Sequence, residues 1–258
     1  MIYVFLPAYG EEVALPRLVC KLCEELGKEK EPFKIVVLDD GSRDRTAEVA
    51  GKLARTVPME ILRHEKNLGL GATLRDGFEH LAKITNDGDW VVSLDCDDTH
   101  EPKYLLRALA KIREGYDVVI LSRFSRGGGQ EGLSPLKTFL SQGAGFFLKL
   151  FFPIHGVREY SCNYRVYRAS ILKKAMKVFG SDFIRLTHLG FVATPEILIK
   201  LRMLEARITE SPFVLHYDQK PTPSKNNSLR TIQGYFALVW YYWIRHPRGS
   251  GDQARDDG

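Results

Sequence analysis

The segment VVSLDCDDTHEP, residues 91–102, leads from an apolar run directly into a group of carboxylates. The run at 90–94 has the composition of a buried strand, and Asp95, Asp97 and Asp98 follow it at once. Like charges this close repel one another unless a cation or a hydrogen-bond donor compensates them. An aspartate-rich turn in solvent is the simplest explanation, because aspartate is common in turns. A site that binds a cation is the alternative, and the surrounding segments decide between the two.

Short β-rich runs alternate with helical patterns over the first half of the chain. The expected strands cover residues 2–7, 34–40, 60–64, 90–94 and 117–122, and the expected helices cover 13–30, 44–57, 71–84 and 103–114. Strands and helices that alternate at these lengths indicate βαβ units with right-handed crossovers. The chain is therefore predicted to form an α/β, Rossmann-like fold with a mostly parallel central sheet between helices.

Polar residues follow most of these strands at the carboxyl end. They are Tyr9 and Glu11 after the first strand, Asp39 and Asp40 after the second, Asp95 and Asp97 after the fourth, and Arg123 after the fifth. The carboxyl ends of parallel strands share one edge of a sheet, and ligands of open α/β sheets bind there. The sequence thus predicts a binding site along that edge, with the aspartates after the fourth strand as part of it.

The composition is that of a globular protein large enough for a sizeable core. Of the 258 residues, 44% are hydrophobic and 27% are charged, and the net charge is +5. A mildly basic chain favours anionic partners such as nucleotides, phosphates or an acidic membrane surface, and we expect no nucleic-acid partner. No stretch reaches the roughly 18 apolar residues of a spanning helix. A strand that opens at residue 2 leaves no room for a signal peptide, so we expect a cytoplasmic protein.

The four cysteines are too few for a disulfide framework in a chain of this length. Cys20 and Cys23 form a CxxC pair within a helical pattern, and Cys96 and Cys162 supply no second pair. A zinc site is therefore not expected, and the thiols are expected to be reduced.

The second half of the chain alternates less clearly. We expect a flexible turn at 127–129, an apolar helical stretch at 135–156, strands at 160–168 and 206–215, helices at 169–179 and 193–204, and a polar loop at 219–228. An aromatic-rich helix follows at 229–246, and residues 247–258 have the composition of a disordered tail. Because no repeat or linker precedes residue 228, residues 1–228 are predicted to be one domain.

Six sequence blocks occur in an order that is specific to one enzyme family. They are PAYGEE (7–12), VVLDDGSRDRT (36–46), KNLGLGATLRDGF (66–78), SLDCDDTHEP (93–102), SRFSRGGG (122–129) and SCNYRVYR (161–168). Together they resemble the inverting family 2 glycosyltransferases of the GT-A fold, and within that family the dolichol-phosphate and polyprenyl-phosphate mannose synthases and their glucosyl relatives. The resemblance covers about residues 2–226.

This resemblance implies a metal-dependent nucleotide-sugar site. Asp95, Cys96 and Asp97 match the DxD motif of the family, with Asp97 as the principal metal ligand and Asp95 near the ribose or the metal. The chemistry agrees, since a departing nucleoside diphosphate needs its charge neutralised and oxygen ligands suit Mg²⁺ or Mn²⁺. The family usually has glutamine where this chain has Thr99, while His100 matches. Threonine offers a single oxygen on a shorter side chain, so water could replace this metal ligand. The departure therefore bears on which metal is preferred, and not on whether a metal is used.

The resemblance also assigns a nucleotide pocket at the ends of the first two strands. Asp39 would accept hydrogen bonds from the base or ribose, Asp40 lies beside it, and the walls would be Pro7, Tyr9, Glu11 and Val37. Ser42 would cap the following helix. The glycine-bearing loop at 67–71 opens the third helix, and either ligand contact or a purely structural role would explain it.

Three cations are implied near the phosphates of donor or acceptor. Arg123, Lys137 and Lys225 match family positions that supply positive charge, and with Asp97 the resemblance gives Arg123 and Lys225 the catalytic roles. The family usually carries an arginine six residues before Lys225, where this chain has Gln219 followed by Lys220.

The acceptor is predicted to be a polyprenyl phosphate, and the donor a GDP- or UDP-hexose with mannose or glucose. Asn163 and Arg165 stand where lipid-phosphate transferases carry their acceptor signature. A hydroxyl acceptor would require a carboxylate base, and the corresponding region offers only Glu196 within a helical pattern. A transferase acting on a saccharide hydroxyl and a nucleotide-sugar binding protein without turnover are the alternatives.

Two apolar stretches, 139–152 and 234–244, combine aromatic residues with basic neighbours. Such segments are typical of a membrane interface, although ordinary core helices have the same composition. We expect peripheral association with the cytoplasmic face of a membrane, with the helix at 229–246 as the candidate anchor.

Overall fold

The computed structural model describes residues 1–189, 191–219 and 228–245. Its central sheet has seven strands in the order β3-β2-β1-β4-β7-β5-β8. The strands are β1 Ile2–Ala8, β2 Phe33–Asp39, β3 Met59–Arg63, β4 Trp90–Ser93, β5 Val118–Ser122, β7 Arg165–Arg168 and β8 Ile208–Pro212. Within this sheet β7 alone runs antiparallel to its neighbours, β4 and β5. The predicted mostly parallel α/β sheet is confirmed.

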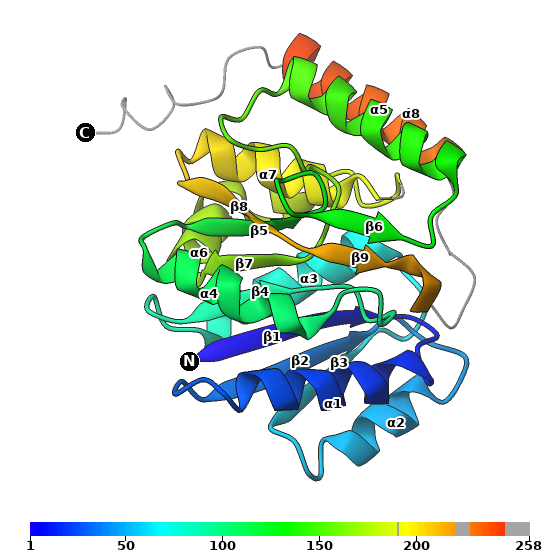
Figure 1. Cartoon of the computed structure of the whole chain (residues 1–258), viewed down its shortest axis with the longest axis vertical. Helices are drawn as coiled ribbons and strands as arrows, with labels where there is room; N and C mark the ends of the chain where they lie inside the picture. The colour runs from blue at the N-terminus through cyan, green and yellow to red at the C-terminus, as the bar shows by residue number, and fades with distance from the viewer. Residues whose placement is uncertain (190, 220–227, 246–258) are drawn as a thin grey trace.

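Helices cover both faces of the sheet (Figure 1). They are α1 Ala14–Leu26, α2 Thr46–Leu53, α3 Leu70–Ile84, α4 Leu105–Arg113, α5 Pro135–Phe151, α6 Ala169–Phe179, α7 Ala193–Met203 and α8 Ser228–Val239, which continues as a π-helical segment, Trp240–Arg245. One core lies under α1, α2 and α4, and the other under α3, α6 and α7. The expected helices of the first half are all present, with ends that shift by a few residues.

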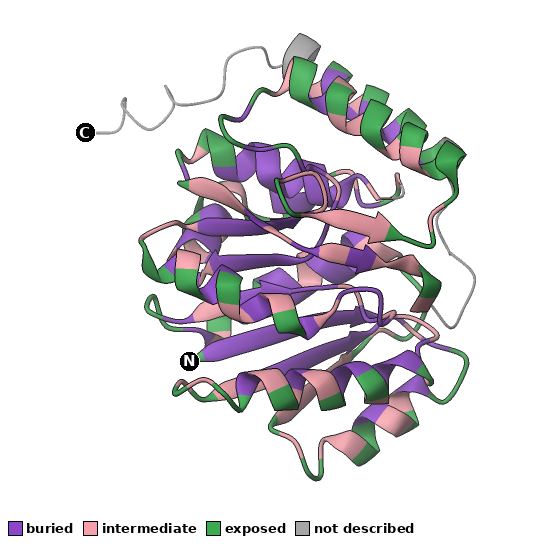
Figure 2. Ribbon diagram, viewed as in Figure 1, coloured by how far each residue is buried: buried purple, intermediate pink, exposed green. Residues whose placement is uncertain are grey.

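The two cores follow from the alternation of side chains along the strands. On β1, Tyr3 and Phe5 enter the core with α3, whereas Val4 and Leu6 enter the core with α1. Gly77 of α3 lies against the Phe5 ring, where a Cβ atom would overlap it. Because both faces are covered, the inner strands β1, β4, β5 and β7 are buried along almost their whole length (Figure 2), whereas the edge strands β3 and β8 are mostly half-buried.

The second half contains a small second sheet that the sequence did not predict. The expected strand at 206–215 divides into β8 and β9 (Val214–His216), and β9 pairs in parallel with β6 (Gly129–Glu131). The division occurs at Phe213, whose N–H donates to Ser122 of the large sheet while its carbonyl accepts from Gly129 of the small one. Gly129, the last residue of the expected turn at 127–129, is therefore the first residue of β6. Of the expected strand at 160–168, only Arg165–Arg168 forms a strand, β7.

The last described helix lies beside α5 on top of the domain (Figure 1). Tyr235, Leu238 and Tyr242 on its inner side belong to the core, whereas Phe236 and Trp240 are exposed. The helix predicted as an anchor is thus part core and part surface. None of the described helices is long and apolar enough to cross a membrane. The predicted loop residues 220–227 and the tail lie outside the described residues.

Candidate active site

The segment after β4 forms a short loop in which neighbours orient Asp95. Asn163, just before β7, donates from Nδ2 to Oδ1 of Asp95 at 3.2 Å, and its own Oδ1 accepts from Ser93 at 3.0 Å. His100 accepts the Asp95 backbone N–H at Nδ1, 3.1 Å away, and its ring stacks on Tyr164. The antiparallel pairing of β4 with β7 brings these groups together, because Ser93 lies opposite Arg165.

Asp97 is held by the residue that stands in the glutamine position of the family pattern. The Thr99 hydroxyl donates to Oδ1 of Asp97 at 2.6 Å, and the Thr99 N–H points to the same oxygen at 3.3 Å. Thr99 is buried, so its short side chain orients Asp97 from the interior of the protein. Its carbonyl accepts the His216 N–H, which ties the loop to β9.

The third aspartate of the segment is not part of the same group. Asp98 has a positive φ of 62°, which turns its side chain to Lys21 of α1 at 2.9 Å. Lys21 also pairs with Glu101 at 2.7 Å. Burial alone would lower the pKa of Lys21, but the hydrogen bonds to Glu101 and Asp98 outweigh it and raise the pKa. Lys21 thus compensates the negative charges of Asp98 and Glu101, and no motif in the sequence indicated this contact.

The two aspartates at the end of β2 have different partners. Asp39 is fully buried; its Oδ1 accepts the Ser42 N–H, while Oδ2 lies 3.1 Å from Arg63 Nε and accepts no hydrogen bond with good geometry from a described residue. Asp40 instead accepts the N–H groups of Leu68 and Gly69, each at 2.8 Å. The carboxylate of Asp40 therefore fixes the glycine-bearing loop before α3, and this contact gives the loop a structural role.

Other predicted pocket residues lie partly at the sheet edge and partly in the core. Tyr9 and Glu11 follow β1 beside the β2 end, where Gly10 N donates to Ser42 and Glu11 N donates to Thr46. Pro7 is a buried β1 residue. The side chains of Val37 and Cys96 lie in the core. Both belong to the core that also contains residues of α1, α2 and α4, so neither lines an open surface.

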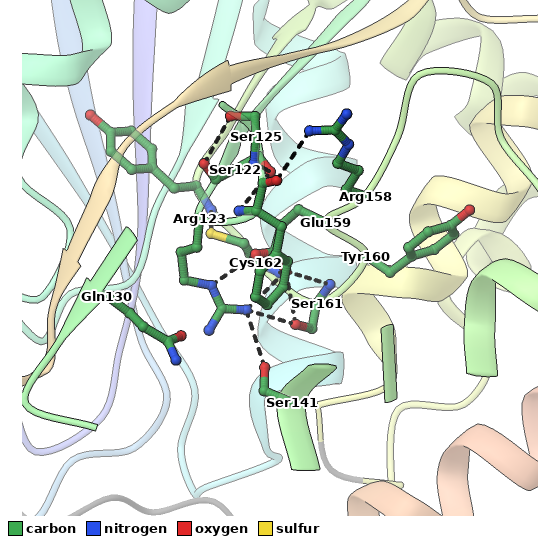
Figure 3. Close-up of polar contacts among 12 residues, drawn as sticks. Ser122, Arg123, Ser125, Gln130, Ser141, Arg158, Glu159, Tyr160, Ser161 and Cys162 are labelled. Atoms are coloured by element: carbon green, nitrogen blue, oxygen red, sulfur yellow. Dashed lines mark hydrogen bonds and ion pairs between the residues drawn. The ribbon is translucent and has the colours of Figure 1, made fainter. Parts of the chain in front are cut away.

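Arg123, after β5, forms a buried ion pair with Glu159 (Figure 3). Its Nε lies 2.8 Å from Oε2 and its Nη2 2.9 Å from Oε1, so the contact is bidentate. Nη2 also reaches the hydroxyls of Ser161 and Ser141 at 3.3 and 3.5 Å. Burial alone would raise the pKa of Glu159, but pairing with Arg123 lowers it. Sequence reasoning found Arg123 and missed Glu159.

The remaining predicted cations are placed differently from one another. Lys137 is exposed on α5 and lies over the ring of Tyr217, 5.0 Å from its centroid. Arg165 has no exposed surface and donates to the carbonyls of Tyr160 and Thr194, both at 2.8 Å. That geometry makes Arg165 a support for the turn before β7. Lys225 lies outside the described residues.

Glu196, the one carboxylate considered as a base, is locked inside the domain. Its Oε2 accepts the N–H groups of Arg185 and Leu186, and its Oε1 accepts from the Tyr242 hydroxyl at 2.6 Å. Lys200 lies 3.7 Å from Oε1. Glu196 thus ties α7 to the π-helical segment after α8 and is completely buried.

Comparison with known proteins identifies the family. The family model described as "Glycosyl transferase family 2" matches residues 3–176. The chain belongs to glycosyl transferase family 2. This match spans β1 to α6 and includes the loops of Asp39, Asp95, Asp97 and Arg123.

Two curated proteins are similar over most of this chain. A dolichol-phosphate mannosyltransferase of Pyrococcus furiosus is 28% identical over 211 residues, which are 81% of this chain and 55% of the relative. An undecaprenyl-phosphate 4-deoxy-4-formamido-L-arabinose transferase of Salmonella paratyphi B is 29% identical over 243 residues, or 92% of this chain and 65% of the relative. The chain therefore spans somewhat more than half the length of these relatives.

Solved structures share the fold at lower identity. Glucosyl-3-phosphoglycerate synthase from Mycobacterium tuberculosis, in complex with Mn²⁺, UDP and glucosyl-3-phosphoglycerate, has a TM-score of 0.59 and 19% identity, covering 95% of this chain and 79% of that one. S. aureus TarS 1–349 in complex with UDP has a TM-score of 0.51 and 17% identity, covering 94% and 72%. At these identities the likeness shows the GT-A fold alone.

The donor set of this family 2 chain fits a divalent cation. Asp95 and Asp97 offer carboxylate oxygens, the ligands preferred by Mg²⁺ and Mn²⁺, and each has one oxygen oriented by a neighbouring side chain. A second group, Glu131, His216 and Asp218 at the β6–β9 sheet, has donor atoms within 4.8 Å of one another. Its two carboxylates are exposed, and an ion pair with the imidazole between them explains the arrangement equally well.

Proposed function

We propose that this chain transfers a hexose from a nucleoside diphosphate sugar to a polyprenyl phosphate, with inversion at the anomeric carbon. The observation that carries the proposal is the placement of opposite charges at one sheet edge. Asp95 and Asp97 follow β4, and Arg123 follows the parallel strand β5, with β7 between them. Two carboxylates that could hold a metal–diphosphate and an arginine that could bind an anionic acceptor thus lie at the same edge of the sheet.

The donor would bind along the ends of β1, β2 and β4. Asp39 has a buried Oδ2 that accepts no hydrogen bond from a described residue, and a uracil or guanine N–H or a ribose hydroxyl would supply one. Tyr9 and Glu11 lie beside it at the end of β1. Asp97, with Asp95, would hold Mg²⁺ or Mn²⁺, which neutralises the departing diphosphate when bound. The donor would be a GDP- or UDP-hexose with mannose or glucose.

A phosphate acceptor suits the cations and needs no general base. Its oxygen is already anionic and can attack the anomeric carbon directly, whereas a sugar hydroxyl must lose a proton. Glu196 is engaged with Tyr242 and two backbone N–H groups, so it serves as a structural group. Arg123 would contact the acceptor phosphate with Lys137 and Lys225, and the names of the two curated relatives support a lipid phosphate.

A membrane surface fits the outer face of the paired helices α5 and α8. Phe139 and Phe146 of α5 are each 71% exposed, and Leu136, Leu140, Leu150, Ile232, Phe236 and Trp240 extend the same apolar character. Phe147 and Phe236 join the two helices, with ring centroids 5.2 Å apart. Exposed apolar groups with basic neighbours such as Lys149 favour peripheral association with the cytoplasmic face of a membrane. Helix α5 would then contribute at least as much as the predicted carboxyl-terminal anchor.

The transfer reaction is tested with radiolabelled GDP-mannose, GDP-glucose, UDP-glucose and UDP-galactose, with Mg²⁺ or Mn²⁺. We expect one donor to give an organic-soluble, acid-labile product with polyprenyl phosphate, and no product with the matched unphosphorylated polyprenol. Transfer to a saccharide hydroxyl in the same panel, with polyprenyl phosphate inert, would refute the proposal.

The membrane surface is tested by co-sedimentation with anionic liposomes. Phe139→Ser with Phe146→Ser should lower the binding affinity by at least about tenfold, because burial of each large apolar side chain contributes about 1.5–3 kcal/mol. Val178→Ser on α6, also an exposed apolar position, is the matched control and should bind as the wild type does. Equal sedimentation of all three proteins would show that α5 is not the contact.

A further inference from the structure

Glu159 is a fully buried carboxylate beside the site, and it has partners on two sides. Both of its oxygens pair with Arg123, at 2.8 and 2.9 Å. Its Oε1 also accepts the Ser161 hydroxyl at 3.0 Å and the N–H groups of Ser161 and Cys162 at 3.2 Å. Figure 3 shows these contacts converging from the end of β5 and from the turn before β7. Glu159 therefore joins two segments that the sequence separates.

On the first side, the pair fixes which edge of Arg123 can meet a ligand. Nε and Nη2 are used by Glu159, Ser161 and Ser141. Nη1 donates to none of the described residues, although the arginine side chain is only 10% exposed. A buried guanidinium whose other edge is occupied can offer Nη1 in one orientation only. Glu159 also offsets the charge of Arg123, so an arriving anion meets a fixed donor within a nearly neutral pair.

On the second side, the carboxylate shapes the turn that supports the metal ligand. Ser161 and Cys162 are bound to Glu159, and the next residue, Asn163, donates to Asp95. The Asn163 side chain is buried and also bound to Ser93, so it has little freedom of its own. A shift of the turn would therefore move the amide that orients Asp95. Groups that orient ligands in this way commonly contribute roughly 10–100-fold to metal affinity.

We propose that Glu159 is a positioning residue that fixes the orientation of Arg123 while offsetting its charge and, through Asn163, orients Asp95 for the metal. The inference rests on the proposed function for what the two groups bind. It assigns one buried carboxylate to both halves of the site, so that the acceptor cation and the metal ligand are aligned by the same group.

The test is Glu159→Gln, which keeps the shape and removes the charge. Phosphate affinity is measured with inorganic phosphate in EDTA, and metal affinity with Mn²⁺ alone by electron paramagnetic resonance. We expect phosphate to bind roughly tenfold more tightly, because Arg123 loses its compensating carboxylate. Mn²⁺ should bind roughly tenfold more weakly, because the turn carrying Asn163 is loosened. A role in stability alone would produce no such split in sign.

Glu210→Gln is the matched control. Glu210 accepts the N–H groups of Arg158 and Glu159 at 2.6 and 2.7 Å, so it holds the same turn from the other side without pairing with Arg123. Its loss should affect stability without tightening phosphate binding. If Glu159→Gln and Glu210→Gln change the two affinities alike, the proposal is wrong.

Glu159→Asp covers the case in which the glutamine variant does not fold. Aspartate keeps the charge but is one methylene shorter, so it cannot hold Arg123 and the turn together. Mn²⁺ binding should weaken several-fold while phosphate affinity does not rise, and wild-type Mn²⁺ affinity would overturn the proposal. Neither readout uses a sugar or a lipid, so a failure to glycosylate polyprenyl phosphate would refute the proposed function and leave this test intact.

Discussion

The proposed donor side and the proposed acceptor side of the site differ in how their side chains are oriented. On the proposed donor side, Asp39 is the last residue of β2 and Asp95 lies two residues after β4, so the backbone of the sheet places them at one edge. On the proposed acceptor side, the backbone also places Arg123 directly after β5, but its guanidinium is oriented by Glu159, a side chain from a distant segment. A chain can encode the first arrangement in its order of elements, whereas the second depends on contacts between distant segments.

The largest expected effect tests the proposed donor side at Asp97, the proposed metal ligand. Asp97→Asn should lower transfer at least about a hundredfold, because a neutral amide cannot replace a carboxylate on the cation that balances the leaving group. The unfolding midpoint should change little, since the residue contributes no core packing. Product formation and thermal unfolding are measured together.

Asp98→Asn is the control for that comparison. It removes the pair with Lys21 from the same loop, so Mn²⁺ affinity should remain close to that of the wild type. Similar Mn²⁺ affinities for the Asp97 and Asp98 variants would show that the loop does not distinguish the two residues as its contacts suggest.

The next effect is on stability. Glu196→Gln should lower the free energy of unfolding by about 1–3 kcal/mol, because the backbone N–H groups of Arg185 and Leu186 lose a charged acceptor. The turnover of the folded protein should stay within a few-fold of the wild type. A drop in turnover of several orders of magnitude, with stability retained, would restore the hydroxyl-acceptor mechanism.

A smaller effect separates the two neighbouring aspartates at the end of β2. Asp39→Ala should weaken nucleoside diphosphate binding roughly tenfold, the usual contribution of a hydrogen bond to a charged group. Asp40→Ala should mainly lower the unfolding temperature, because it frees the loop at Leu68 and Gly69. Calorimetric titration measures the nucleotide affinity of both variants, and thermal unfolding measures their stability. Equal changes in affinity and in unfolding temperature for the two variants would contradict the separate roles given to Asp39 and Asp40.

The smallest effect is on pH dependence. Pairing with Arg123 lowers the pKa of Glu159 below its ordinary value of 4.5. The stability from this pair is therefore present above pH 4.5 and is lost as the pH falls through the lower folded-state value. Glu159→Gln should flatten the acid limb by at most about 1.4 kcal/mol per pH unit, the slope for one proton. Denaturant unfolding from pH 3 to pH 7 measures it, and parallel limbs would contradict the assignment.

The sequence predicted the placement of Asp39, Asp95 and Asp97 at the carboxyl edge of the sheet, because two simple rules operate there. Alternating strands and helices predict a parallel sheet, and residues after its strands must lie at the carboxyl edge. The rules could not find Lys21 or Glu159, because an ion pair across the fold leaves no periodic pattern. The same rules could not show that the Arg165 guanidinium donates hydrogen bonds to two backbone carbonyls inside the domain.

The division of the expected strand at 206–215 has a similar cause. Its residues read as one extended run, and Phe213 marks no break in the pattern. The break exists because Phe213 bonds to Ser122 on one side and Gly129 on the other, which belong to different sheets. The resemblance supplied residue positions, but the contacts around Arg123 required the folded chain.

The position of β7 in the sheet has a consequence for how the protein is made. β5 ends at Ser122, yet both of its neighbours, β7 and β8, follow it in the chain. During synthesis, at roughly 5–20 residues per second, β1 to β4 can pair while β5 waits a few seconds for Arg165 to emerge. Throughout that interval an apolar strand has both edges open, and open edges are places where another chain can pair. Asn163 lies two residues before β7, so it is synthesised just before the strand that pairs with both β4 and β5. The side chain that orients Asp95 therefore becomes available at about the time when the central sheet can be completed.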